Sequence, residues 1–485
     1  MVLTVTGTLM SRYLHLATRL REHIQMGYFA PGDKLPSVRQ LAGEHGVSIS
    51  TVQEAYRVLE QDGLVEAKAK SGYFVARAKE RIARPKESKP PQRPMDVSLW
   101  EDVLAMLMGH GVDASCEFQH AMPDMSSSTL KPLLKNIYEL NRHRPQDGMS
   151  YGHVQGELGL REQLARLTAT TGCQLDAEDF VVTSGCQEAL SVCLRAVAQS
   201  GDVIAVESPG FYGAMQAIKA ANLKALEIPT DSRDGMSIEA LKLAMDQWPV
   251  KAILVTPTVN NPQGYVMPLA KKQALYQLAR EYDIAIIEDD IYGDIAFEYP
   301  RPKTIKSFDE DGRVLLCSSF SKTLAPGFRV GWIAPGRYRD KVTHIKYVSS
   351  SMCPTLPQLA IGNFIRQGGY DRHLRSMRQS YRKARDAMLK GIEQHFPAHT
   401  RVSFPEGGFI LWLELPEGYD AARLAELAKQ RGIILAPGQM FSATGKYRNC
   451  LRFNYIDRDL ATREQSIAVL GDILAAMASS KLETA

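Results

Sequence analysis

Apolar residues at helical spacing open the chain and predict three short helices. The first is marked by Tyr13, Ala17, Leu20 and Ile24, and its pattern stops at Gly27. A second helix is expected after Ser37, which fits a capping box with Gln40, and a third after Ser48. The inner face of the third comprises Val52, Ala55, Tyr56 and Leu59. Two alternating runs, LVEAKAK and YFVAR, then predict a hairpin.

From about residue 150 the pattern changes to apolar runs separated by longer helical segments. The runs are DFVVTSG, DVIAVES, KAILVTP, IAIIEDD and VLLCSS. Strands that are apolar throughout and alternate with helices predict a mostly parallel α/β sheet with helices on both faces. Chemistry in such sheets collects at the carboxyl ends of the strands, so the polar residues there are the candidates to examine.

Residues 77–95 separate these two regions. The stretch is rich in Lys and Arg, and four prolines (Pro85, Pro90, Pro91 and Pro94) prevent a continuous helix. The pattern therefore predicts a small domain over residues 1–76, a basic linker over 77–95 and a large domain over 96–485.

Composition narrows the class of protein. The chain has 485 residues, 45% hydrophobic and 23% charged, which is ordinary for a globular protein of more than one domain. No apolar run approaches the roughly 18–20 residues needed to cross a bilayer. Seven cysteines without a C-x-x-C pair favour reduced thiols. The N-terminus has no basic segment before its short apolar stretch, which argues against a secretory signal. We expect a cytoplasmic protein.

Basic charge concentrates at the N-terminal end. Residues 1–95 hold 15 Lys and Arg against 9 Asp and Glu, while the remainder holds 43 against 45. Helix, helix, turn, helix and hairpin describe a winged helix-turn-helix, and the basic excess favours a polyanion partner. A small structural or protein-binding module remains an alternative. The DNA-binding candidates from this pattern are Ser48, Ser50, Thr51, Gln53, Lys68, Lys70 and Gly72.

The small domain also resembles a known family. PGDKLPSVRQLAGEHGVSISTVQEAYRVLEQDGLV and the following SGYFV are similar to the GntR-type DNA-binding domain. The resemblance implies that Arg39 and Thr51 contact DNA and that Gly72 lies at the tip of the wing. Ile49 stands where many members have arginine, so no operator sequence can be carried over.

Several kinds of site compete for the strand ends of the large domain. Ser184, Gly185, Cys186 and Gln187 open a helix and suit a phosphate, although an ordinary helix cap explains them equally well. The acids of IIEDDIYGD fit a magnesium site, but no phosphate-binding loop accompanies them. The sequence contains no G-x-G-x-x-G motif, and its 11 histidines show no tight metal-ligand spacing. Nucleotide, dinucleotide and metal sites therefore lose support, and we expect no metal.

The remaining residues suit pyridoxal 5′-phosphate (PLP), which needs a lysine amine, a carboxylate against its ring nitrogen and a phosphate cradle. Lys322 supplies the amine and Asp289 the carboxylate. Ser319, Ser321 and Arg329 suit the phosphate, Asn261 and Tyr292 the ring oxygen, and Phe211 the ring face. Arg452 suits a carboxylate of a bound amino compound.

The order of these motifs is itself a resemblance. YGHVQGELGLREQLA, TSGCQEAL, ESPGFYG, NNPQG, EDDIYGD, SSFSKTLAPGFRVGW, PEGGFILWLEL and LRFNY are similar to fold-type I relatives of aspartate aminotransferase. The resemblance implies a PLP-binding domain with a small C-terminal α+β subdomain, and it gives the residues above those roles. It also implies a dimer in which Tyr151 reaches the neighbouring subunit's site. Ala121 replaces the usual glycine on the substrate side.

The two halves together resemble the MocR group of bacterial transcription regulators. This implies a head-to-tail homodimer that binds paired DNA half-sites and senses PLP or an amino compound through aldimine exchange at Lys322. The genes under control then concern amino-acid or cofactor metabolism. Two alternatives stay open: a working aminotransferase with an attached DNA-binding module, and a plain GntR-type repressor whose large domain only dimerises.

Overall fold

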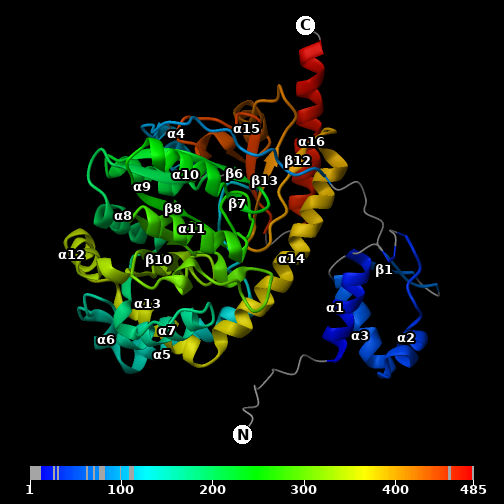
Figure 1. The fold of residues 1–485 in the computed structure, drawn as a ribbon, viewed down its shortest axis with the longest axis horizontal. Coiled ribbons are helices and arrows are strands. Elements are labelled where there is room, and N and C mark those ends of the chain that lie inside the picture. Colours follow the sequence, from blue (N-terminus) through cyan, green and yellow to red (C-terminus); the bar gives the residue numbers. More distant parts are fainter. Residues whose placement is uncertain are drawn as a thin grey trace. The chain divides into compact units, whose positions relative to one another are not determined.

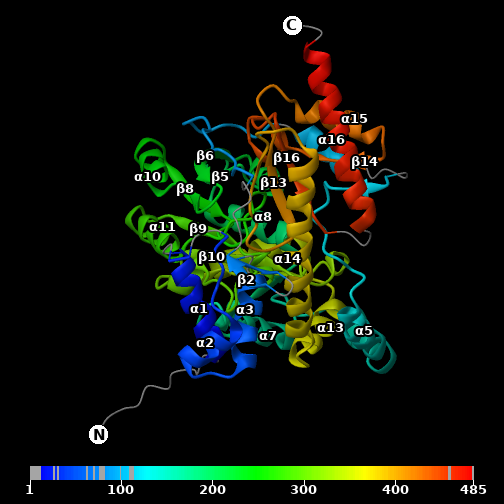
Figure 2. The same ribbon diagram turned by 90° about the vertical axis from the view of Figure 1, so that its right-hand side faces the viewer.

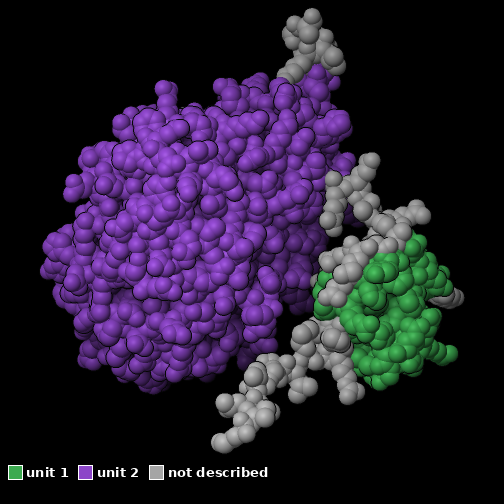
Figure 3. All heavy atoms as spheres, viewed as in Figure 1, with its two compact units in different colours: residues 1–81 green, residues 82–485 purple. Residues whose placement is uncertain are grey.

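The structure is a computed structural model that describes residues 12–25, 28–29, 32–61, 64–68, 71–75, 82–98, 100–108, 114–456 and 460–482. The chain divides into a small unit, residues 1–81, and a large unit, residues 82–485 (Figure 3). Among the described residues, no helix is long and apolar enough to span a bilayer.

The small unit has three helices and a hairpin in its described part. Its elements are α1 (Arg12–Gln25), α2 (Val38–His45), α3 (Ile49–Gln61), β1 (Val65–Lys68) and β2 (Gly72–Val75). The strands pair antiparallel, with Val65 opposite Val75. Val52, Ala55, Tyr56 and Leu59 of α3 are fully buried against Leu16, Leu20 and Leu41. The residues whose spacing predicted the third helix therefore form part of the core of this unit.

The capping predicted for the small unit forms in part. The Ser37 hydroxyl accepts a 3.2 Å bond from the Gln40 backbone N–H, and the Ser48 hydroxyl accepts one from Thr51 at the same distance. The side chain of Gln40, however, donates forward to Glu44 at 2.9 Å instead of reaching back to Ser37. The reciprocal half of the capping box is absent because Glu44, one turn on, is a charged acceptor on the same exposed face.

An eight-stranded sheet forms the centre of the large unit, with strand order β4-β11-β10-β9-β8-β5-β6-β7. The strands are β4 (Val181–Thr183), β5 (Val203–Ser208), β6 (Lys224–Asp231), β7 (Gly235–Met236), β8 (Val250–Val255), β9 (Ala285–Asp289), β10 (Val314–Ser319) and β11 (Gly331–Ala334). The neighbours from β10 across to β6 are parallel, while β4, β11 and β7 pair antiparallel. All five predicted strands are present in a mostly parallel sheet.

Helices cover both faces of this sheet (Figures 1 and 2). The helices of the large unit are α4 (Trp100–Met108), α5 (Lys131–His143), α6 (Pro145–Met149), α7 (Leu158–Ala169), α8 (Cys186–Val197), α9 (Tyr212–Ala220), α10 (Ile238–Gln247), α11 (Leu269–Glu281), α12 (Arg339–Ser350), α13 (Thr355–Arg366), α14 (Gly369–His395), α15 (Ala421–Lys429) and α16 (Leu460–Leu482). Alternate residues of β9 lie on opposite faces of the sheet. Ile287 packs in the core with α8 and α9, and Ile286 packs in the core with α10 and α11. The strand is apolar throughout because both faces are buried.

Two smaller sheets and a long helix complete the large unit. The strands are β3 (Cys116–Glu117), β12 (Arg401–Val402), β13 (Ile410–Glu414), β14 (Ile433–Ile434), β15 (Ala436–Pro437) and β16 (Cys450–Asn454). Their order is β12-β13-β16-β15 in one sheet, and β14 pairs with β3 in the other. The 27-residue α14 runs beside α16 (Figure 2). Arg452 lies on β16 in this C-terminal part.

The described part of the predicted linker, residues 82–95, belongs to the large unit. Ala83 accepts a backbone bond from Val402 at 2.9 Å, and the Ser88 hydroxyl accepts from the Thr230 N–H at 2.8 Å. Met95 pairs antiparallel with Ala225 at the edge of the central sheet. This segment is thus held along the large unit by its backbone. The predicted domain boundaries stay predictions.

Candidate functional site

The predicted site residues come from the carboxyl ends of neighbouring strands. Asp289 is the last residue of β9 and Ser319 the last of β10, while Asn261 and Phe211 lie in the loops after β8 and β5. Ser184 to Gln187 lead from β4 into α8. Strands β5, β8, β9 and β10 are parallel neighbours, and β4 lies on the other side of β11. The sheet therefore brings residues more than 100 positions apart to one edge.

Lys322 is a buried amine in the turn that follows β10. Its Nζ donates a 2.5 Å bond to the carbonyl oxygen of Ala121. Burial, together with the positive charge of Arg452, lowers the pKa of Lys322 to about 8. A larger share of neutral amine at neutral pH makes this lysine a better nucleophile than an exposed one.

Arg329 joins the two halves of the predicted phosphate cradle. Its Nη2 donates to the Ser184 carbonyl oxygen at 2.7 Å and its Nη1 to the Ser321 hydroxyl at 3.4 Å. The Ser319 hydroxyl accepts the Ser321 N–H at 3.1 Å. Gly185 has φ of +90°, and a Cβ there would lie 2.3 Å from Arg329 Nη2. The cradle thus depends on a glycine that leaves room for the guanidinium.

The carboxylate of Asp289 is buried at the bottom of the site. Its Oδ1 accepts the Ile291 N–H at 3.2 Å and lies 3.5 Å from the Cys186 sulfur. Burial raises the pKa of Asp289 to about 6, although these hydrogen bonds oppose the rise. A buried carboxylate with so few partners is suited to a protonated ring nitrogen, which would supply the missing positive charge.

Two buried polar groups of the site have no hydrogen-bond partner among the described residues. They are the side-chain oxygen of Asn261 and the hydroxyl of Tyr292. Burial also raises the pKa of Tyr292, so its hydroxyl stays a proton donor. Buried polar groups are almost always paired in folded proteins, and two unpaired ones among the residues predicted for one site indicate a polar ligand.

Arg452 is fully buried, yet two of its donors are unused. Its Nη2 donates to the Gln119 carbonyl oxygen, while Nε and Nη1 have no partner among the described residues. The guanidinium lies 5.6 Å from the ring centroid of Tyr212 and 5.2 Å from that of Phe441. An unpaired buried fork of N–H groups between two aromatic rings is suited to a carboxylate.

Two other predicted site residues, Gln187 and Tyr151, have different surroundings from those above. The Gln187 amide donates to the Gly213 carbonyl oxygen at 2.7 Å and so ties the start of α8 to α9. Tyr151 is 91% exposed and turns away from its own chain. Its predicted role in a neighbouring subunit stays a prediction.

The DNA-binding candidates gather at the start of α3 and on the hairpin. Ser48 bonds the hydroxyls of Ser50 and Thr51 at 2.9 and 2.7 Å, and Gln53 on the same turn is exposed. Arg39 is exposed on α2. The Lys68 amine lies 4.5 Å from the Phe74 ring centroid, and Gly72 has φ of +100° at the hairpin turn. Lys70 lies outside the described residues. The exposed hydroxyl and amide groups of α3 are suited to a DNA groove.

Comparison with known proteins identifies both units. Residues 12–75 match the bacterial regulatory proteins of the gntR family, and residues 121–467 match aminotransferase class I and II. The uncharacterized HTH-type transcriptional regulator YjiR of Escherichia coli is 48% identical over 92% of this chain and 95% of its own. YdcR of the same organism, also an uncharacterized HTH-type regulator, is 34% identical over 96% and 99%. The chain belongs to the MocR-type regulators.

A solved structure supports the same assignment for the large unit. Pyrococcus horikoshii kynurenine aminotransferase, in complex with PMP and its substrates, superposes with a TM-score of 0.72 at 29% identity, covering 79% of this chain and 95% of that one. The match to aminotransferase class I and II implies PLP as the cofactor. The site fits PLP: Lys322 offers an amine with a lowered pKa, the Gly185–Arg329 cradle a phosphate site, and Asn261 and Tyr292 unpaired polar groups.

The sequence did not predict the residues that hold the loops of this MocR-type site in place. The buried Glu207 carboxylate accepts from the Tyr265 hydroxyl, the Thr256 N–H and the Asn260 amide, and so holds the loop that carries Asn261. Asn454 lies two positions after Arg452 on β16 and bonds the segment that contains Ala121. The alternation of side chains along a strand would have placed Asn454 on the face of Arg452.

Proposed function

We propose that this protein is a PLP-dependent, DNA-binding transcription regulator of bacterial amino-acid or cofactor metabolism that acts in the cytoplasm. The proposal rests on one observation: a single chain combines exposed hydroxyl groups on α3 with a site for an amino compound. In that site, Lys322 has a lowered pKa and Arg452 has unpaired donors for a carboxylate. PLP, when bound, supplies an aldehyde that links to amines and a ring that withdraws electrons.

Each residue of the site would then have its own role in binding PLP or an amino compound. Lys322 holds the cofactor through its amine, Asp289 retains a proton on the ring nitrogen, and Arg329 with Ser319 and Ser321 binds the phosphate. Arg452 would bind the carboxylate of an incoming amino compound, whose amine would compete with that of Lys322 for the aldehyde. A ligand changes DNA affinity only as far as it binds two arrangements of the protein with different affinity.

The regulator would act as a homodimer. Large apolar side chains are exposed on α5, on α6, in the loop after α6 and at the start of α7, namely Leu134, Tyr138, Met149, Tyr151 and Leu158. Elements α5 and α6 contact one another, so these side chains belong to one region of the surface (Figure 1). Exposed apolar patches of this kind mark protein interfaces. A head-to-tail dimer would place Tyr151 in the partner's site and present two small units to paired half-sites.

The test is footprinting of the full-length protein on the DNA upstream of its own gene, with and without PLP. Protection of two half-sites at fixed spacing, altered by PLP, is the expected result. Equal protection with and without PLP, and no effect of Lys322→Ala, would instead favour a plain repressor whose large unit only dimerises.

A working aminotransferase is the second candidate function, and the unpaired Arg452 donors favour it. Steady-state conversion of amino acids to keto acids by the PLP-loaded protein separates the two. Rapid turnover with no retention of DNA would establish the enzyme. Slow or single turnover with retained DNA is what the regulator predicts.

A further inference from the structure

The backbone from Gln119 to Met122 is held by side chains of the candidate site. Arg452 Nη2 donates to the carbonyl oxygen of Gln119, and Lys322 Nζ donates to that of Ala121 at 2.5 Å. The Asn454 amide donates to the carbonyl oxygens on either side of Ala121, to His120 at 2.7 Å and to Met122 at 3.1 Å. Four consecutive carbonyl groups are thus tied to three side chains.

Two of those three side chains are the ones that ligands would take. Joining of the Lys322 amine to the PLP aldehyde forms a C=N bond and releases one water, which leaves at most one N–H on that nitrogen. On the proposed function, PLP therefore weakens the hydrogen bond between Lys322 and the segment. A carboxylate at Arg452 would accept from the unpaired Nε and Nη1, so the bond from Nη2 to the Gln119 carbonyl oxygen can stay.

Asn454 differs because no ligand of the site competes for it. It is 4% exposed, its side-chain oxygen accepts the Ile456 N–H at 2.8 Å, and this fixes the amide toward the segment. When Lys322 reacts with PLP, the two Asn454 bonds remain. They would limit how far the segment moves and keep Ala121 near the lysine.

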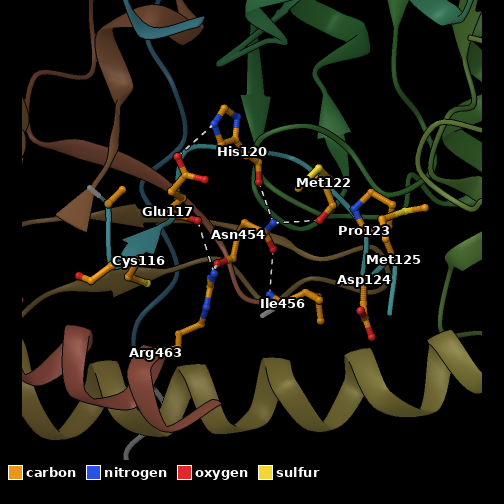
Figure 4. A pocket seen from close by; sticks show the side chains of 12 residues that line it. Cys116, Glu117, His120, Met122, Pro123, Asp124, Met125, Asn454, Ile456 and Arg463 are labelled. Atoms are coloured by element: carbon orange, nitrogen blue, oxygen red, sulfur yellow. Dashed lines mark hydrogen bonds and ion pairs between the residues drawn. The ribbon is translucent and has the colours of Figure 1, made fainter. Parts of the chain in front are cut away.

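The structure also provides space for such a movement. A pocket of about 410 Å³ borders the segment and is lined by His120, Met122 and Asn454, with Glu117 and Arg463 beyond them (Figure 4). A shift of the segment therefore changes the shape of this pocket.

We propose that Gln119–Met122 is a strap that Lys322 releases when PLP binds, and that Asn454 is the positioning residue that holds it. The strap links occupancy of the site to β3, which begins three residues before Gln119. This inference rests on the proposed function, since it requires PLP to react with Lys322.

The seven cysteines are all buried, so a thiol at position 122 can be labelled selectively. Met122 is 51% exposed, and Met122→Cys with a nitroxide spin label reports the mobility of the strap; Leu243→Cys, on α10 and 62% exposed, is the labelling control. Addition of PLP to the full-length protein should shift the label at position 122 to a more mobile spectrum and leave the control unchanged. With Lys322→Ala the label should be mobile before PLP is added and should not respond to it.

Asn454→Ala in the Met122→Cys background should give a more mobile label without PLP than Asn449→Ala, in which the lost amide donates to the Leu415 carbonyl oxygen elsewhere on the same sheet. Absorbance recorded on the same samples separates the two levels of the argument. Bound PLP with an unchanged label, or equal mobility in Asn454→Ala and Asn449→Ala, would overturn the strap. Failure of PLP to bind at all would overturn the proposed function and the strap with it.

Discussion

The sulfur of Cys186 lies 3.5 Å from the Asp289 carboxylate, so the first residue of α8 contacts the last residue of β9. The phosphate cradle and the ring carboxylate are thereby fixed to each other before any cofactor binds. Asp289→Asn keeps this shape but removes the negative charge. We expect PLP affinity to fall by about 1.5–3 kcal/mol, the usual contribution of a charge-assisted hydrogen bond, or about 10–150-fold in Kd.

Spectroscopic titration with PLP measures this loss. The matched control is Asp340→Asn in the first turn of α12, which removes the same charge from the large unit outside the site. Equal PLP affinity of the two variants would show that Asp289 does not face the ring nitrogen.

The lowered pKa of Lys322 predicts a pH dependence for cofactor attachment. Only the neutral amine attacks an aldehyde. With a pKa of about 8, about one lysine in ten is neutral at pH 7, against roughly one in 2,500 for an ordinary lysine. The attachment rate should rise about tenfold per pH unit below pH 7 and level off above about pH 8. Stopped-flow absorbance measures it, with Nα-acetyl-lysine as reference. A rate that keeps rising to pH 10 would contradict the lowered pKa.

Gly185→Ala should disrupt the phosphate cradle, because its Cβ would lie 2.3 Å from Arg329 Nη2. Gly201 is a closely matched control: its φ of +91° equals that of Gly185 within a degree, and nothing lies within 4 Å of its Cβ position. Both variants carry the backbone strain of alanine at positive φ, roughly 1 kcal/mol in stability. PLP binding should weaken in Gly185→Ala alone. A similar loss in both variants would mean that strain, and not the cradle, is responsible.

Arg39 tests the small unit. Arg39→Ala should weaken binding to the footprinted DNA by about 1–3 kcal/mol and reduce its salt dependence, because an exposed guanidinium is lost from the DNA face. Arg57→Ala is the control, since Arg57 is also exposed but its guanidinium pairs with Glu54 on the same helix. Fluorescence anisotropy over a range of salt concentrations gives both quantities. Equal losses for the two variants would place the DNA face elsewhere.

The sequence predicted most of what short-range patterns control. Val52 and Leu59 were placed in a core by their spacing, and the five apolar runs of the large domain all form strands. The antiparallel strand β11, between β10 and β4, was not predicted, because nothing local in GWIA distinguishes its direction or its place in the sheet. Topology of this kind depends on long-range pairing.

The site was predictable where each residue follows a strand, and less so where the fold brings distant segments together. Lys322 and Asp289 stand out in their own motifs. The bonds from Arg452 to Gln119 and from Asn454 to His120 join positions more than 330 residues apart, and no local pattern marks backbone carbonyls as acceptors. Gln40 shows the reverse case: its motif fitted a capping box, but Glu44 competes for its amide.

The most direct test of the account is chemical trapping of the cofactor on the full-length protein. After incubation with PLP, reduction with borohydride and digestion, mass spectrometry should find the phosphopyridoxyl group on Lys322, with DNA affinity changed relative to the unreacted protein. Lys322→Ala should carry no such group and show no change in DNA affinity. A protein that stays colourless, or carries the group only on other lysines, would contradict the account.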